Sequence, residues 1–126
     1  MERRLISGHS PYEAVVGFSR AVVADGKVYV AGTAPIPPDG GDPPQSAYDQ
    51  AQLCLEIIGE ALERAGAGFE DVVRTRIFVT GREHYEEVAR AHGEIFGEIR
   101  PASTAVVTDL LDARWKVEIE AEAILE

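Results

Sequence analysis

The sequence predicts an α+β fold in which two helices pack on one face of a mainly antiparallel, mixed sheet. Two observations predict it. β-prone runs and amphipathic helical stretches follow one another in the order ββ-α-β-α-ββ, and no linker or change of composition separates them. Helices gathered on one face of an antiparallel sheet are typical of this class. Because 126 residues is an ordinary size for one domain, we expect a single domain over residues 1–126.

The first two strands are predicted by a hairpin motif. Asp25-Gly26 lies between two β-prone runs, residues 21–23 and 28–30. Asp-Gly favours a tight hairpin because the central residues of that turn need positive φ. These runs are therefore expected to pair directly with each other.

A loop and two helices account for much of the remaining chain. The stretch 35–44 holds five prolines and two glycines, which excludes a regular element and predicts a surface loop. Apolar residues then recur at helical spacing between Ser46, a suitable N-cap, and Gly66, a suitable C-terminal glycine. A second helix is expected to begin at Thr80, where Thr80 and Glu83 would form a capping box.

The later strands show alternating patterns. Residues 71–80 place one set of side chains toward the helices and the other set outward. The inward set is Val73, Thr75, Ile77 and Val79, and the outward set is Arg74, Arg76 and Phe78. Further strands are expected at 104–110 and at 116–125, and the last one carries Glu118, Glu120 and Glu122 on its outward face. An uncovered face of this kind is either solvated or buried against another subunit.

Charge and composition exclude several classes of function. The net charge is −10 and no Lys/Arg cluster offsets it, so nucleic-acid binding is disfavoured. No apolar stretch is long enough for a signal peptide or a membrane span, so we expect no membrane association. The single cysteine excludes an internal disulfide and suits the cytoplasm. His84 and His92 are expected two helical turns apart, too far for both to bind one zinc ion, and no cofactor motif occurs.

Several side chains could carry chemistry, and each has a simpler alternative. A glutamate of the last strand is either solvated or, if desolvated at an interface, able to exchange protons with a ligand or water. Phe18 and Arg20 are expected to project from one face of the first strand. Arg20 is then either half of a structural ion pair or a group that binds a carboxylate. His92 and Cys54 lie on apolar helix stripes and are expected to be packed, whereas Trp115 is either packed or a pocket wall.

Beyond these patterns, the chain resembles the RidA/YjgF family, formerly called L-PSP endoribonucleases. The resemblance covers most of residues 15–124. It rests on Phe18-Ser19-Arg20-Ala21-Val22, Val28-Tyr29-Val30-Ala31-Gly32-Thr33-Ala34-Pro35, Gln50-Ala51 to Gly66, Asp71-Val72-Val73-Arg74-Thr75, Phe96-Gly97, Arg100-Pro101-Ala102-Ser103-Thr104 and Val117-Glu118-Ile119-Glu120-Ala121.

The resemblance implies a chorismate-mutase-like fold and a homotrimer with ligand clefts between subunits. It also implies hydrolysis of enamines and imines to a 2-keto acid and ammonia without a cofactor. Glu118 matches the glutamate that positions water in the family. The candidate substrate-binding positions are Phe18, Ala31, Thr33, Ala89 and Ser103, to which we add Arg20 as a hypothesis from the residues themselves, because its direction matches that of Phe18.

This sequence departs from the family pattern at several of those positions. Ser103 stands where the family has its carboxylate-binding arginine, and the gap-free spacing to Glu118 supports that match. Phe18, Ala31 and Ala89 stand where a tyrosine, a serine and an asparagine are usual. The sequence thus predicts a cytoplasmic homotrimer that binds a small acid, and leaves open whether it is a deaminase with altered substrate or a non-catalytic binding or regulatory module. A ribonuclease is disfavoured by the acidic charge.

Overall fold

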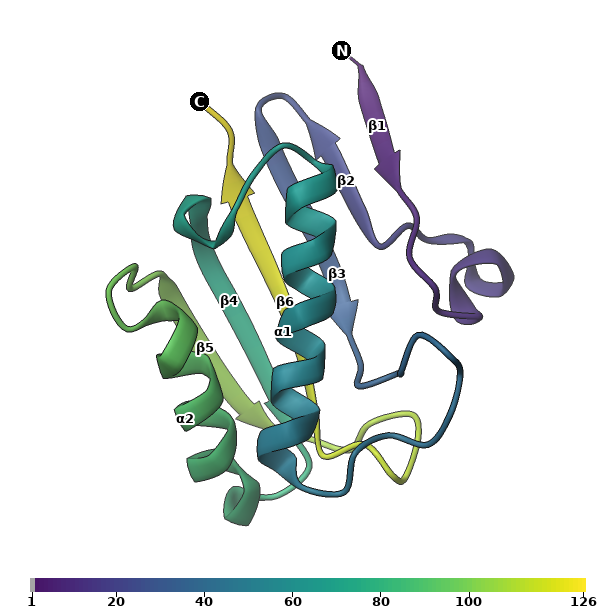
Figure 1. Ribbon diagram of the computed structural model, residues 1–126, viewed down its shortest axis with the longest axis vertical. Helices are drawn as coiled ribbons and strands as arrows, with labels where there is room; N and C mark the ends of the chain where they lie inside the picture. Colours follow the sequence, from purple (N-terminus) through teal and green to yellow (C-terminus); the bar gives the residue numbers. More distant parts are fainter. Residues whose placement is uncertain (1) are drawn as a thin grey trace.

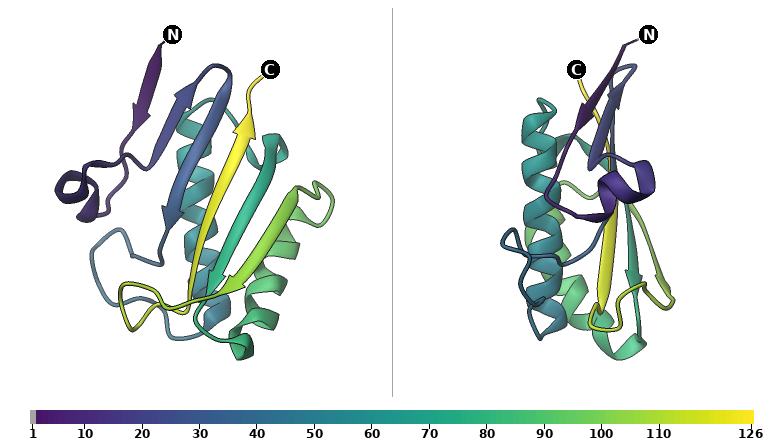
Figure 2. Two further views of the ribbon diagram at one scale, coloured as in Figure 1. Left: turned by 180° about the vertical axis from the view of Figure 1, so that it is seen from behind. Right: turned by 90° about the vertical axis from the view of Figure 1, so that its right-hand side faces the viewer.

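The computed structural model describes residues 2–126 and confirms the predicted α+β class. A six-stranded sheet has the order β1-β2-β3-β6-β4-β5, and only the β4–β5 pair is parallel (Figure 1). Figure 2 shows α1 and α2 on one face of this sheet and no helix of comparable length on the other. The elements are β1 Arg3–Ile6, β2 Ala21–Ala24, β3 Lys27–Thr33, α1 Ala47–Arg64, β4 Val72–Val79, α2 Tyr85–Phe96, β5 Ala102–Val107 and β6 Val117–Ile124, with short turns η1 Glu13–Gly17, η2 Phe69–Asp71 and η3 Arg82–His84.

The predicted hairpin joins β2 to β3. Asp25 and Gly26 have φ angles of 52° and 73°, as the hairpin motif requires. Strand β1 was not predicted from the sequence, and it pairs antiparallel with β2 at the edge of the sheet. Only Ile6 of its four residues is buried, so β1 lacks the alternation that reveals a strand.

Helix α1 forms where the sequence predicts it. The hydroxyl of Ser46 accepts a hydrogen bond from the backbone N–H of Asp49 at 3.0 Å, and Gly66 adopts a φ of 89° after the last turn. The buried face of α1 covers β3 and β6 and forms the centre of the core with the inward residues of the sheet.

The predicted start of the second helix at Thr80 is wrong. The backbone N–H of Thr80 donates to Lys116 O at 3.0 Å, so this residue continues the sheet. A short 3₁₀ turn, η3, follows, and α2 begins only at Tyr85. No capping bond forms between Thr80 and Glu83, because a long-range backbone bond already holds Thr80.

A bulge near the start of β4 corrects a second expectation. The register with β6 shifts between Val72 and Arg74, so Val72 points inward and Val73, expected to be buried, is 45% exposed. Beyond the bulge, Thr75, Ile77 and Val79 are buried as predicted.

The face opposite the helices carries paired charges. Glu120 of β6 lies across from Arg76 of β4 and Glu122 lies across from Arg74, and the Arg76 guanidinium contacts both carboxylates, at 3.1 and 3.2 Å. Tyr29 of β3 adds a large apolar group that is 43% exposed. The glutamate row is therefore held by arginines on the neighbouring strand, and this open face combines ion pairs with exposed apolar surface.

Candidate functional site

Glu118 lies at the end of the open face where two strands lose register. The pairing of β3 with β6 shifts between Val30 and Thr33, and the Glu118 carboxylate rests against Gly32 in this irregular stretch. A side chain at position 32 would collide with Oε2 of Glu118. Burial raises the pKa of Glu118 above its usual range, although the nearby Arg20 acts in the opposite direction. The site thus holds a half-buried carboxylate that retains its proton to higher pH than an exposed one.

Arg20 is the buried cation next to Glu118. It is 5% exposed, and its Nη2 donates to the carbonyl of Gly32 at 2.5 Å. Its Nε lies buried without a hydrogen-bond partner among residues 2–126. Burial lowers the pKa of Arg20, while the charges of Glu13 and Glu118 oppose that change. A buried guanidinium with a free N–H is a suitable group for binding an anion.

Phe18 and Arg20 do not lie within a strand, as the sequence analysis expected. They connect η1 to β2, because the chain leaves a π-helical turn at Gly17 before the sheet begins at Ala21. The two side chains are nevertheless neighbours, with the guanidinium carbon of Arg20 5.5 Å from the centre of the Phe18 ring. This contact supports the orientation of Arg20 through a cation–π interaction.

Glu13, in the π-helical turn η1, is a residue of this site that sequence reasoning missed. Its Oε1 accepts a hydrogen bond from the backbone N–H of Gly8 at 2.9 Å, and its Oε2 is buried without a partner. A turn of five residues has no periodic pattern that would reveal which way Glu13 points. Its position depends on the tertiary structure, in which Glu13 and Arg20 both pack on Gly8.

The other predicted positions are distributed over both sides of the sheet. Ala31 is beside the cluster, since its backbone N–H donates to Arg20 O at 3.0 Å. Thr33 is fully buried and its hydroxyl donates to Ala31 O at 2.8 Å, which leaves no donor for a ligand. Ala89 is half-buried on α2, behind the sheet as seen from Glu118. That Ala31, Thr33 and Ala89 contact a ligand stays a prediction.

Ser103 lies on the helix side of β5, within a hydrogen-bonded group. Its Oγ is 2.8 Å from Oγ1 of Thr75, which is in turn 2.9 Å from Nε2 of His92. Burial lowers the pKa of His92, whose ring packs against Phe96 at 4.6 Å, so the expectation of a packed, hydrogen-bonded histidine describes it well. Within one chain, Ser103 and Glu118 therefore occupy opposite faces of the sheet.

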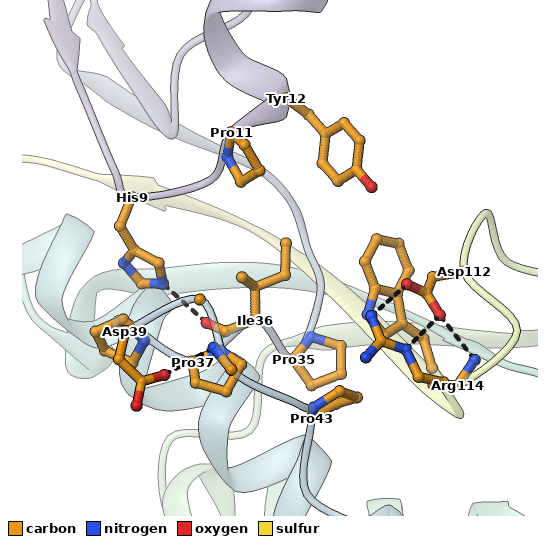
Figure 3. Close-up of a pocket in the computed structure, with 14 residues that line it drawn as sticks. His9, Pro11, Tyr12, Pro35, Ile36, Pro37, Asp39, Pro43, Asp112 and Arg114 are labelled. Carbon is orange, nitrogen blue, oxygen red and sulfur yellow. Dashed lines mark hydrogen bonds and ion pairs between the residues drawn. The ribbon is translucent and has the colours of Figure 1, made fainter.

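A separate hollow of about 330 Å³ lies between the proline-rich loop and the segment before β6 (Figure 3). Trp115 is 6% exposed and also lines this hollow, so it is both packed and a wall. Its ring meets that of Tyr12 edge to face, with centroids 6.4 Å apart. His9 closes one side, where its Nε2 bonds to Ile36 O at 2.8 Å.

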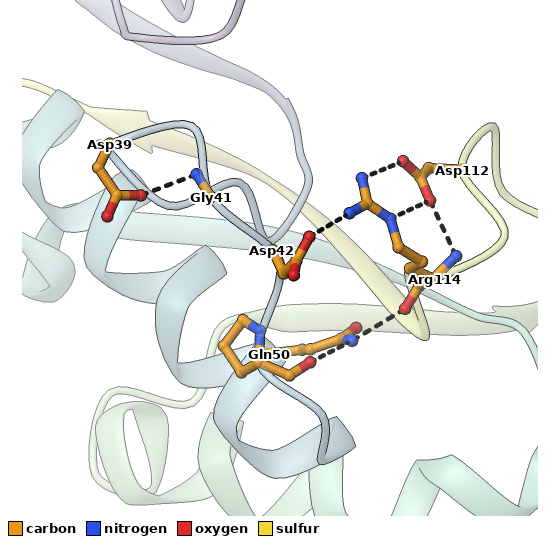
Figure 4. A network of polar contacts seen from close by, with 7 residues as sticks. Asp39, Gly41, Asp42, Gln50, Asp112 and Arg114 are labelled. Carbon is orange, nitrogen blue, oxygen red and sulfur yellow. Dashed lines mark hydrogen bonds and ion pairs between the residues drawn. The ribbon is translucent and has the colours of Figure 1, made fainter.

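Arg114 ties the two walls of this hollow together (Figure 4). Its guanidinium binds Asp112 through two nitrogens, at 3.1 and 2.8 Å, and Asp42 through the third, at 3.0 Å. These bonds hold the pKa of Asp112 down, at about 2. Gln50 of α1 joins the same network by donating to Arg114 O at 3.0 Å. Because the guanidinium binds carboxylates from both loops, this network serves to anchor them.

The described residues contain neither a metal-binding cluster nor a membrane-spanning helix. Among residues 2–126, no three histidine, cysteine, aspartate or glutamate side chains come together as a metal ion would need. In the same residues, no helix has the length and apolar character needed to cross a membrane.

The fold and the site together define a class of protein. These are small α+β proteins with helices on one face of a mixed sheet and a glutamate beside a buried cation on the open face. The family model described as Endoribonuclease L-PSP matches residues 8–125. The chain therefore belongs to the family known as RidA/YjgF.

Three known proteins illustrate the similarity. The crystal structure of Rv2704 from Mycobacterium tuberculosis, a member of the YjgF/YER057c/UK114 family, matches with a TM-score of 0.89 and 40% identity, covering 98% of this chain and 100% of that one. A 2-iminobutanoate/2-iminopropanoate deaminase from Capra hircus is 30% identical, over 97% of this chain and 90% of its own length. The structure of E. coli TdcF with bound serine matches with a TM-score of 0.81 and 25% identity, covering 98% of this chain and 94% of that one.

Proposed function

We propose that this protein binds a small 2-imino acid beside Arg20 and Glu118 and hydrolyses it to a 2-keto acid and ammonia. The observation that carries the proposal is the half-buried Glu118, whose pKa is raised by burial, next to a buried arginine with a free N–H. The goat relative named 2-iminobutanoate/2-iminopropanoate deaminase and the serine bound to TdcF support a small acid of this kind as the ligand.

The chemistry needs a base and a fixed substrate. Water adds to the C=N carbon of the protonated imine, and Glu118 accepts the proton that the water loses. Glu118 then returns that proton to the amino group of the carbinolamine, and ammonia leaves as the C=O bond forms. The hydroxyl proton of the carbinolamine passes through Glu118 to the ammonia, which is released as ammonium with the carboxylate restored. A carboxylate with a raised pKa is a stronger base than an exposed one and so suits this step near neutral pH. No cofactor enters the reaction.

Arg20 is proposed to replace the cation that the family pattern places at Ser103. Ser103 offers a neutral hydroxyl, and in one chain it lies on the far side of the sheet from Glu118. Arg20 lies beside Glu118 and acts on its charge. Because a guanidinium binds carboxylates through charge-assisted hydrogen bonds, Arg20 can orient an acid substrate where Ser103 cannot.

We further propose that the open face assembles into a homotrimer. This face combines the Arg76 ion pairs with the exposed ring of Tyr29, a mixture typical of subunit interfaces. In a trimer, the clefts between subunits could bring Ser103 of one copy near Glu118 of another. Light scattering measures the mass in solution, and a monomer would contradict this part of the proposal. We also propose a cytoplasmic location, since Cys54 is a free thiol.

The decisive experiment generates 2-iminobutanoate in situ and follows the release of 2-oxobutanoate. The wild-type protein should accelerate release over buffer, and Arg20→Ala should raise KM strongly. Arg20→Lys should restore only part of the affinity, because lysine lacks the planar fork. Arg82→Ala, in the exposed turn η3, is the control for the loss of one positive charge. No acceleration by the wild type would reject the deaminase.

A second candidate is a non-catalytic module that binds small acids. The replacements at Phe18, Ala31 and Ala89 favour it, because each removes a polar group that the family pattern places at the site. Binding of 2-oxobutanoate without any release from the imine would support this candidate over the enzyme.

A further inference from the structure

Two side-chain polar atoms in the described residues 2–126 are buried without a hydrogen-bond partner, and they occur at the same place. They are Nε of Arg20 and Oε2 of Glu13. Both side chains pack on the backbone of Gly8: a methyl group at that position would lie 2.7 Å from Oε2 of Glu13 and 3.1 Å from Cδ of Arg20. Native proteins keep few such unpartnered groups, and the exceptions often serve a function.

Each of these two side chains is anchored through one atom and leaves another free. Glu13 accepts the Gly8 N–H at its Oε1, and Arg20 donates to Gly32 O through its Nη2. The Glu13 charge raises the pKa of Arg20 against the effect of burial, so the two groups sense each other electrostatically. Within residues 2–126 as described, Glu13 and Arg20 form no direct ion pair with each other. The site therefore presents one free N–H donor and one free carboxylate oxygen close together.

We propose that Glu13 determines specificity at this site by binding the protonated nitrogen of an imino or amino acid whose carboxylate is held by Arg20. This inference rests on the proposed function and extends it. A charged N–H donor makes a strong hydrogen bond to a carboxylate, whereas the carbonyl oxygen of a keto acid has no proton to donate and is repelled. Glu13 would thus favour the substrate over its own product and promote product release.

The segment that carries Glu13 can open without disturbing the core. The turn η1 contains no buried residue, and Val15 and Val16 within it are 84% and 69% exposed. In both views of Figure 2 this turn lies to the side of β1 and β2, away from α1 and α2. Segments with few buried contacts open at low free-energy cost. Displacement of η1 uncovers Arg20 and lets a ligand enter between the two free atoms.

The test compares two stable small acids, of which one carries an ammonium group and the other a carbonyl oxygen on the carbon next to the carboxylate. L-serine carries an ammonium group, and 2-oxobutanoate carries a carbonyl in its place. Isothermal titration would measure both with the wild type, Glu13→Gln and, as a control for the lost charge, Glu63→Gln on the exposed side of α1. Glu13→Gln should weaken serine binding by about tenfold to a hundredfold and leave 2-oxobutanoate binding unchanged or tighter. Glu63→Gln should change neither.

Other results would overturn the inference. Equal weakening of both ligands by Glu13→Gln would mean that Glu13 only supports Arg20, and no change in either would mean that it does not contact the ligand. Wild-type binding of 2-oxobutanoate but not of serine would refute the role of Glu13 while leaving the proposed acid site intact. Binding of neither would contradict the proposed function itself. Glu13→Asp, which keeps the charge on a shorter side chain, should fall between the wild type and Glu13→Gln.

Discussion

The carboxylate of Glu118 lies directly against Gly32, in the stretch where β3 and β6 lose register. The same Gly32 accepts a hydrogen bond from Arg20 through its carbonyl oxygen. One glycine therefore brings the acidic and the basic groups of the candidate site together. Several properties of the protein should depend on this arrangement.

Replacing Gly32 by alanine should displace the Glu118 carboxylate. The added methyl group would overlap Oε2 of Glu118, so the side chain must move. We expect the rate of keto-acid release to fall about a hundredfold, since small misplacements of catalytic groups have large effects. Gly93→Ala in α2, where a methyl group meets no atom within 4 Å, is the matched control and should keep full activity. Full activity of Gly32→Ala would contradict the placement of Glu118 in the site.

The pH dependence of the reaction should report on Glu118. Only its ionised form can accept a proton, so the rate should fall as the pH drops through its pKa. Burial raises that pKa above the usual 4.5, so the decline should begin at higher pH than for an exposed glutamate. Glu118→Gln should lower the rate by about 10²- to 10⁴-fold and remove this decline. A decline that persists in the residual activity of Glu118→Gln would assign it to another group. Glu63→Gln, on the exposed side of α1, is the control for the loss of one carboxylate.

Arg76→Glu should disrupt the proposed trimer. The change places a third negative charge opposite Glu120 and Glu122, which now share the Arg76 guanidinium. Repulsion across the open face should lower the mass in solution from three copies to one, as measured by light scattering. Arg90→Glu makes the same charge change on α2 and should leave the mass unaltered. A stable trimer of Arg76→Glu would place the interface elsewhere.

Gln50→Leu should destabilise the fold strongly. Gln50 is 1% exposed, and its side chain donates to Pro44 O at 2.8 Å and to Arg114 O at 3.0 Å while accepting the Lys116 N–H at 2.7 Å. Leucine would leave three backbone groups without partners, which should lower the free energy of unfolding by about 2–4 kcal/mol. Urea denaturation measures this loss, and Gln52→Leu on the exposed side of α1 is the control. A loss as small as that of the control would refute the anchoring role.

His92 should make the folding stability of the protein depend on pH. Burial lowers the pKa of His92 in the folded protein below its usual 6.5, so the unfolded chain takes up the proton first as the pH falls. Stability should therefore decrease as the pH drops through about 6.5, and the loss should be complete below the folded pKa. Denaturation on both sides of this range should show a smaller decrease for His92→Gln than for the wild type. His84→Gln controls for having one histidine fewer, and an unchanged pH dependence of His92→Gln would contradict the effect.

The features predicted best from the sequence are those that depend on short-range interactions. The hairpin at Asp25-Gly26 and the helix that begins after Ser46 depend on φ angles and hydrogen bonds within a few residues, and both formed as expected. The predicted start of α2 was wrong because the backbone N–H of Thr80 bonds to the carbonyl of Lys116, far along the chain. Strand β1 and the bulge at Val73 were missed for the same reason, since pairing with distant strands creates them.

For the candidate site, the sequence alone determined that Glu118 alternates with buried neighbours and faces away from the helices, because strand periodicity requires it. The family resemblance singled out Glu118 among the three glutamates of that row. Only the tertiary structure showed that Gly32 lies beneath Glu118, that Arg20 is buried beside it and that Glu13 leaves a free oxygen over Arg20. These relationships arise from the irregular pairing of β3 with β6 and from the packing of Glu13 and Arg20 on Gly8, and no local pattern encodes contacts between segments so far apart in the chain.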